Sequence, residues 1–240
     1  MKYLLLWLEA PLQSWGADSR FDFRKTMGYP VKSGIYGMLL AASGDSGPQE
    51  DLLAKMADAP FTVIAFQGKA ARMRDFHMVG NGYDKNNPWE RMLIPQTPAK
   101  TIAVGGGAKL TCREYLQDRV FAVISGLHDE LANKFSKALQ NPVYDMYLGR
   151  KCCVPTDLIF RGTFPSEHDA LQALCKIAEE KQKVPKMMIT DATQDEIDAG
   201  KNVILINDVP VRFGPHKLYR DRWIIEKPWG QPSPAKLAKL

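Results

Sequence analysis

The segment from Tyr144 to Cys153 (YDMYLGRKCC) sets aromatic rings, a glycine turn and two cations side by side. Tyr147 offers a flat face on which an RNA base can stack, and Gly149 allows another backbone to come close. Arg150 and Lys151 can contact phosphate oxygens. An ordinary solvated turn can have the same composition, so the segment indicates RNA binding only together with further residues.

A further cation and a helix start could join this turn at an RNA surface. Arg113 can neutralise a phosphate, and the alternative is that it pairs with Asp118 or Glu114 on a helix. A helix is expected to begin at Lys32 and Ser33, where backbone N–H groups would point at a bound phosphate. The alternative role of Ser33 is that of a helix cap alone.

The loop after the first expected strand carries two more candidates. Gln13 supplies an amide that can hydrogen-bond base edges, and Trp15 supplies an aromatic surface. The alternative for Trp15 is a core anchor beside the glycine turn at Gly16.

The competing hypothesis is an enzyme. A metal-independent ribonuclease needs a general base near the ribose 2′-OH and a cation near the developing phosphorane. His77 with Arg74 and Tyr83, or His216 with Lys217 and Tyr219, could take these roles. A lone histidine is more often structural, however, and no cluster of carboxylates suits two-metal hydrolysis.

The composition is that of an ordinary globular protein. Of the 240 residues, 45% are hydrophobic and 25% are charged, which is enough apolar material for a core. The apolar run Tyr3–Leu8 is too short to span a membrane and lacks the flanking features of a signal peptide. The four cysteines, with Cys152 and Cys153 adjacent, argue against a disulfide framework or a structural zinc site. We therefore expect a cytoplasmic protein with no metal and no cofactor.

Positive charge is concentrated in two parts of the chain. The formal net charge is +5, and residues 212–240 alone carry seven Lys or Arg against two Asp or Glu. Residues 61–113 carry eight against three. Such segregation favours a polyanionic partner on one face. Because a net charge of +5 is modest for unaided nucleic-acid binding, we expect the chain to dock into a larger assembly rather than act as a free-standing RNA-binding regulator.

The hydrophobic pattern predicts an α+β protein whose first domain, residues 1–154, is ferredoxin-like (RRM-type), because strand, helix, strand, strand and helix follow one another. Gly34 and Gly37 leave one face of the first helix thin enough for close packing. The expected strands are Lys2–Glu9, Phe61–Phe66 and Arg119–Ile124, and the expected helices start at Ser33 or span Glu50–Ala57 and His128–Leu139.

Residues 68–110 do not fit between two paired strands. This excursion is rich in glycine and proline, and loops of such length in compact domains are mostly functional or disordered. We expect a long protruding hairpin or thumb. The run GGG at residues 105–107 lacks both a following GK[ST] and the GxGxxG spacing, which argues against a nucleotide site.

A smaller β-rich α+β subdomain is expected over residues 155–228, and a mobile tail over residues 229–240. Its helix would bury Leu171, Leu174 and Ile177. The expected elements are strands near Leu158–Phe160 and at Met187–Thr190, Val203–Asn207 and Trp223–Glu226, and a helix at Ser166–Lys181.

Six blocks of the sequence together resemble the Cas-five family of type I-E CRISPR Cascade complexes. Their order and spacing match that family over nearly the whole chain, which makes the set specific although no single block is decisive. The blocks are LLLWLEAPLQSWG (residues 4–16), PVKSGIYGML (30–39), RDFHMV (74–79), REYLQDRVFAV (113–123), YDMYLGRKCC (144–153) and FGPHKLYRDRW (213–223).

The resemblance implies an RRM-like domain with a thumb that binds and caps the 5′ handle of the guide RNA (crRNA). The implied partners are Cas-seven backbone subunits, whose assembly the chain would help to nucleate, and the large subunit, Cas-eight or CasA. Target DNA would be reached only through the complex. The candidate RNA-binding residues are Gln13, Trp15, Lys32, Ser33, Arg74, His77, Arg113, Tyr147, Arg150 and Lys151.

The resemblance also bears on the enzyme hypothesis. The related subunit of type I-C systems is a repeat-processing nuclease, which keeps that alternative open. In type I-E systems a separate family member cuts the repeat and the Cas-five subunit holds the product. His77 and its neighbours match the type I-E pattern, so we expect a non-catalytic subunit.

Overall fold

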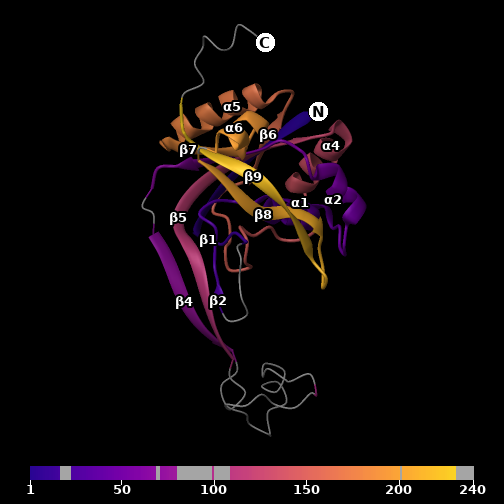
Figure 1. The fold of residues 1–240 in the computed structure, drawn as a ribbon, viewed down its shortest axis with the longest axis vertical. Helices are drawn as coiled ribbons and strands as arrows, with labels where there is room; N and C mark the ends of the chain where they lie inside the picture. Colours follow the sequence, from indigo (N-terminus) through magenta and orange to yellow (C-terminus); the bar gives the residue numbers. More distant parts are fainter. Residues whose placement is uncertain (17–22, 69–70, 80–98, 100–108, 201, 231–240) are drawn as a thin grey trace.

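The structure is a computed structural model that describes residues 1–16, 23–68, 71–79, 99, 109–200 and 202–230. It is a mixed α/β structure dominated by one antiparallel sheet (Figure 1). The strands are β1 (Lys2–Gln13), β2 (Phe23–Arg24), β3 (Phe61–Phe66), β4 (Ala71–Val79), β5 (Lys109–Leu127), β6 (Phe160–Phe164), β7 (Pro185–Asp191), β8 (Val203–Arg212) and β9 (Leu218–Pro228). The helices are α1 (Lys32–Ser43), α2 (Glu50–Met56), α4 (Asp129–Gln140), α5 (Glu167–Glu180) and α6 (Gln194–Ala199).

The strands are hydrogen-bonded in the order β6-β1-β5-β3-β7-β9-β8, and neighbours in this order are antiparallel. Two further strands pair with β5 outside this order. β4 is antiparallel to β5, and the short strand β2 is parallel to it.

Strand β5 is 19 residues long and changes partners along its length. Its second half lies between β1 and β3, where Thr62 is opposite Ile124. Its first half lies between β2 and β4, where Phe23 and Phe76 are both opposite Cys112. In Figure 1 this first half and β4 extend away from the helices. One strand therefore joins the core of the sheet to a projecting ladder.

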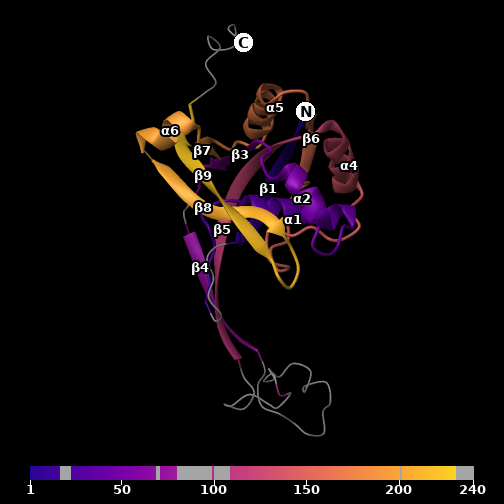
Figure 2. The ribbon, with the colours of Figure 1, turned by 45° about the vertical axis from the view of Figure 1, so that its right-hand side comes forward.

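Helices cover both faces of the central sheet, with α1, α2 and α4 grouped together and α5 apart from them (Figure 2). Side chains of β1 alternate between two buried clusters: Leu4, Leu6 and Leu8 lie in the larger cluster, and Leu5 and Trp7 lie in the cluster with α5. Because both faces are covered, β1 is apolar almost throughout rather than alternately polar. This explains the continuous apolar run seen in the sequence.

Most predicted elements are observed, and several of them have different bounds. β1 continues to Gln13, β5 begins at Lys109 instead of Arg119, and the predicted strand near Leu158 is observed as β6. The missed portion of β5, KLTCREYLQD, mixes polar and apolar residues without a continuous apolar run, so it does not stand out as a strand. Helix α6 was not predicted because none of its residues is buried.

The part of the predicted excursion at residues 68–110 that the structure describes forms strands. β4 and β5 pair from Ala71 opposite Gln117 to Val79 opposite Lys109. The triple glycine at 105–107 and nearly all of the predicted tail at 229–240 lie outside the described residues.

The strands that follow residue 155 join the same sheet as the earlier ones. β6 pairs with β1, and β7 pairs with β3 and then with β9. The predicted helix is present as α5, with Leu174 fully buried and Leu171 and Ile177 packed beside it. The division of the chain into two domains at this point stays a prediction.

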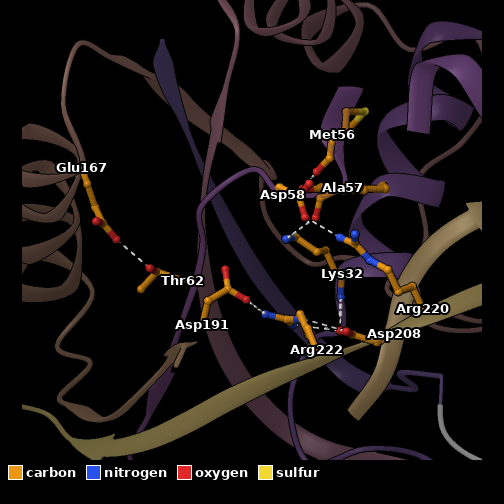
Figure 3. Close-up of polar contacts among 11 residues, drawn as sticks. Lys32, Met56, Ala57, Asp58, Thr62, Glu167, Asp191, Asp208, Arg220 and Arg222 are labelled. Atoms are coloured by element: carbon orange, nitrogen blue, oxygen red, sulfur yellow. Dashed lines mark hydrogen bonds and ion pairs between the residues drawn. The ribbon is translucent and has the colours of Figure 1, made fainter. Parts of the chain in front are cut away.

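A buried network of charges fastens the C-terminal strands to α1 (Figure 3). Arg222 of β9 donates to both carboxylate oxygens of Asp208 on β8, at 2.7 and 2.9 Å, and to Asp191 on β7 at 2.6 Å. The same Asp208 accepts the backbone N–H of Lys32 at 2.7 Å. Because the guanidinium and the Asp208 carboxylate are nearly buried, loss of either would leave an uncompensated charge in the interior.

The prediction that the start of α1 binds RNA is wrong for Lys32 and Ser33. The N-cap of α1 is Val31, so Ser33 lies inside the helix and is not its cap. The carboxylate of Asp208 occupies the place that a bound anion would take at the helix N-terminus. The side chain of Lys32 is buried, and its Nζ donates to the carbonyl of Ala57 at 3.0 Å. The helix start therefore serves the fold.

Burial of Lys32 predicts a pH dependence of stability. Desolvation lowers the pKa of Lys32 from 10.5 to about 8. Between these values the unfolded chain binds a proton that the folded chain has released, so this residue makes the free energy of unfolding rise with pH, by at most about 1.4 kcal/mol per pH unit. In Lys32→Met this contribution should be absent. Urea unfolding of both proteins at the two ends of the window tests it, and parallel changes in the two proteins would contradict it.

Candidate nucleic-acid interface

The turn that follows Tyr147 is packed tightly against the end of β1. The N–H of Ser14 donates to the carbonyl of Leu148 at 3.0 Å, and the N–H of Leu148 donates to the carbonyl of Cys153 at 2.8 Å. Gly149 has φ +105°, and a Cβ atom built there would lie 1.7 Å from the carbonyl oxygen of Ser14. The close backbone approach predicted at Gly149 is therefore real, but the partner is the protein's own chain.

Arg150 holds this turn on β2 and β5. Its Nη1 donates to the carbonyl of Glu114 at 2.8 Å, and its Nη2 donates to the carbonyl of Arg24 at 3.0 Å. The guanidinium carbon lies 4.7 Å from the centre of the Tyr115 ring. A planar guanidinium can serve two carbonyls and a ring at once, which a lysine cannot. Two N–H groups of Arg150 are thus committed to backbone carbonyls.

The two adjacent cysteines take different positions in this turn. Cys153 is buried, and burial raises the pKa of its thiol to about 11. Cys152 is exposed, and its Sγ lies 3.5 Å from the hydroxyl of Tyr115. Burial is the main cause that raises the pKa of Tyr115 above its usual value, and the contact with Cys152 raises it further. Cys153 and Tyr115 thus support the turn from its buried side.

The two hydrogen bonds of Arg150 to the carbonyls of Glu114 and Arg24, called the Arg150 clamp below, bring cations of the turn next to those of two strands. Arg24 of β2 is paired with Arg113 of β5 in the ladder. Lys25 is exposed next to Arg24 in the sequence, and Lys151 is exposed next to Arg150. Arg113 lies on a strand and not on a helix, which overturns the alternative based on helical ion pairs. The ladder and the clamp thus bring cations from three distant parts of the sequence to one region.

Tyr147 lines a groove next to the end of α4. The groove has a volume of about 680 Å³, and its lining includes Leu139 of α4 together with Val154 and Leu158, which follow the helix in the sequence. The hydroxyl of Tyr147 donates to Asp145 at 3.3 Å. The nearby Asp145 carboxylate raises the pKa of Tyr147 above its usual value.

Gln13 and Trp15 are interior residues. Gln13 donates to the carbonyls of Leu8 and Arg119 at 3.2 and 2.6 Å, and it accepts from the Trp15 indole at 3.1 Å. Both side chains are buried, so their predicted role as RNA contacts is wrong and the core-anchor alternative for Trp15 holds. A Cβ at Gly34 would lie 3.0 Å from the Trp15 ring, which confirms the predicted close packing on α1.

The block RDFHMV forms part of β4. Arg74 is exposed, and its Nη2 lies 3.3 Å from Oε1 of Glu114. His77 is opposite Thr111 in the ladder, and its side chain lies outside the described part of the structure. Arg74 and His77 are thus on the same ladder as Arg113, but Arg74 shares the face of Glu114, which is opposite to that of Arg113. A common role of Arg74 and Arg113 at one RNA site stays a prediction.

Three exposed residues of the same strands were not among the predicted contacts. Arg24, Arg72 and Phe76 all lie on the ladder formed by β2, β4 and β5. A signal for two of them is in the sequence, because Arg72, Arg74 and Phe76 alternate with less exposed residues at the spacing of a strand. That signal was missed because residues 68–110 were interpreted as a hairpin or thumb whose strand bounds were not assigned.

The described residues contain no group of three or more His, Cys, Asp or Glu that could hold a metal ion. In that same part of the chain, no helix is long and apolar enough to cross a membrane.

The close packing at Gly149 predicts a large effect of a small substitution. In Gly149→Ala, the added methyl group meets the Ser14 carbonyl and the backbone is strained at positive φ, so the free energy of unfolding should fall by about 3 kcal/mol or more. Gly214→Ala is the matched control, because Gly214 has φ +91° with nothing within 4 Å. Urea titration measures both, and equal losses would show that the close contact is unimportant.

Comparison with known proteins places this geometry in a family. The family described as "CRISPR-associated protein (Cas_Cas5)" matches residues 3–224. "CRISPR system Cascade subunit CasD" of Escherichia coli (strain K12) is 26% identical over 172 residues, which cover 67% of this chain and 70% of that protein.

Two solved structures have a similar fold. A chain of a structure titled "CRISPR RNA-guided surveillance complex" is 27% identical with a TM-score of 0.72, over 94% of this chain and 89% of that one. A second, titled "Crystal structure of Cas protein", has 24% identity and a TM-score of 0.58 over 94% of each chain, and it supports the fold alone. Because the family match runs from β1 to β9 and the fold agrees, the chain belongs to the CRISPR-associated Cas5 family.

Proposed function

We propose that this protein is a subunit of a type I-E Cascade surveillance complex that binds and caps the 5′ handle of the crRNA. Similarity to CasD of E. coli and to a chain of an RNA-guided surveillance complex supports the assignment to such a complex. The observation that carries RNA binding is the clamp of Arg150, which holds the turn with Lys151 against the strands of Arg24 and Arg113.

The chemistry of this region suits a structured RNA end. Exposed cations such as Lys25 and Lys151 can neutralise phosphates, and the partly exposed ring of Tyr147 can stack on an unpaired base. Arg150 would act mainly by holding the turn, since two of its N–H groups are used internally. The handle would then lie along β2, β5 and residues 147–151.

The arrangement of elements supports an RRM-type domain with a thumb as part of this proposal. Strands β6-β1-β5-β3, with α1 between β1 and β3 and α4 between β5 and β6, follow the β-α-β-β-α-β order of ferredoxin-like domains. The projecting ladder of β4 and β5 would be the base of the thumb (Figure 1). Cas-seven backbone subunits and the large subunit are the proposed protein partners, with target DNA reached through the complex.

We also propose that the subunit is not an enzyme, with the metal-independent nuclease of type I-C as the alternative. His216 is exposed in the turn between β8 and β9, where its carbonyl accepts from Arg212 at 2.7 Å. No described contact places this imidazole within reach of a cation and a carboxylate together. His77 is part of the ladder, and Tyr83 lies outside the described residues.

Handle binding should depend on Lys151 and Tyr147. Loss of a phosphate contact or of a base stack predicts that Lys151→Ala and Tyr147→Ala each weaken binding of handle RNA, by roughly 1–3 kcal/mol, with little change in unfolding. Tyr144→Ala is the control, because Tyr144 is an exposed tyrosine in the same segment but does not line the groove. Filter binding with handle RNA and chemical footprinting of the complex measure the effect. A handle as reactive in the complex as in free RNA would refute the proposal.

Cleavage assays distinguish a non-catalytic RNA-binding subunit from a nuclease. The full chain, incubated with repeat RNA in the presence of a chelator, should leave the RNA intact. His77→Ala and His216→Ala should leave repeat processing by the assembled system unchanged, because the general base and the cation would belong to another protein. Specific cleavage at the handle boundary that disappears in either variant would establish the type I-C-like alternative instead.

A further inference from the structure

One face of the projecting ladder carries two arginines and a phenylalanine in a row. Arg72, Arg74 and Phe76 alternate along β4, so their side chains point to the same face. Their exposed fractions are 54% and 65% for the two arginine side chains and 70% for Phe76. Arg74 is the neighbour of Phe76 on this face toward the start of β4. An aromatic residue as exposed as Phe76, next to a cation, is unusual unless it meets a partner.

The arginines of this face are held in place before any ligand arrives. Glu114 of β5, directly opposite Arg74, lies 3.3 Å from Arg74 and 3.7 Å from Arg72. The guanidinium of Arg74 also lies over the ring of Phe23, 5.1 Å from its centre. The single carboxylate of Glu114 pairs with two guanidinium groups, so the three side chains together carry a net positive charge. Ordering both side chains in advance reduces the entropy lost on binding.

The face offers two flat surfaces and a cation. The ring of Phe76 is open, and the plane of Arg74 that is turned away from Phe23 is available to a base. Side chains two residues apart on a strand are about 6.8 Å apart, which is about twice the 3.4 Å rise of one strand in a duplex. The spacing therefore fits bases that have been drawn apart in a single strand. Arg72 lies beyond Arg74 along the strand, where it is placed to contact the phosphate next to the base on Arg74.

We propose that Arg72, Arg74 and Phe76 form a stacking platform for single-stranded nucleic acid, separate from the proposed handle site. The two sites lie on opposite faces of the ladder. Arg150 packs on Tyr115, and Tyr115 points away from Glu114 because successive residues of β5 alternate. The platform goes beyond the proposed function, since it assigns a second strand or a second segment of the same strand to this subunit.

The test uses the full chain and two fluorescent probes, a short oligouridine RNA and an oligothymidine DNA. Fluorescence anisotropy should show that Phe76→Ala binds the preferred probe about ten-fold more weakly, as loss of one base–aromatic stack predicts. Phe76→Trp should restore binding, because the indole also stacks. A probe that contains 5-iodouracil should form a photo-crosslink that maps to the peptide with Phe76.

Leu110→Ala is the matched control for a merely apolar contact. Leu110 is 47% exposed and lies on the same face, opposite Met78 in the ladder, but it has no ring. It should bind both probes as the wild type does. Tyr147→Ala and Lys151→Ala should bind both probes normally while losing handle RNA, so that failure of the handle site and failure of the platform give different patterns.

The outcomes separate the possible sources of the strand. Tighter binding of RNA would point to the guide, tighter binding of DNA would point to a strand of the target, and either supports the platform. Unchanged binding of both probes by Phe76→Ala would overturn it. A second result would also overturn it. If Phe76→Ala and Leu110→Ala both lost a co-purifying protein subunit while binding the probes normally, the face would be a protein-docking surface.

Discussion

The hydrogen-bonding of β5 on both of its edges is the constraint on which the rest of the structure depends. Its second half satisfies its backbone groups with β1 and β3 inside the core, and its first half satisfies them with β2 and β4 outside it. Since a backbone slip of one residue would turn every side chain to the other face, the buried half also sets the register of the projecting half. The packing of the core thus decides which residues of the ladder are exposed.

The buried charges of this protein show why positive residues alone do not mark an RNA surface. Arg222 of β9 donates to Asp208 on β8 and to Asp191 on β7, and Asp208 also accepts the backbone N–H of Lys32 at the start of α1 (Figure 3). The side chain of Lys32 donates to a backbone carbonyl. These contacts join β7, β8 and β9 to the first helix. Arg222, one of the cations near the C-terminus, is therefore structural. Exposed charge is found on the ladder and its adjoining turn, where Arg72, Arg74 and Lys151 lie.

Much of the fold could be predicted because most elements have strong local patterns. The continuous apolar run of β1 and the spacing of Phe135 and Leu139 on α4 were sufficient to assign these elements. The site was predicted less well. Lys151 is exposed and Tyr147 is partly exposed, whereas Gln13 and Trp15 are buried. Nothing local distinguishes an amide or an indole that serves the core from one that serves a ligand.

The sequence by itself determined the family, the order of most strands and helices, and the chemical types present in the turn at residues 144–153. Only the tertiary structure decided the role of each group in it. Gly149 meets Ser14 rather than RNA, and Arg150 meets the carbonyls of Arg24 and Glu114. The physical reason is that local pattern reports a residue's own preferences, whereas burial and the use of hydrogen-bonding groups depend on segments more than a hundred residues away in the chain.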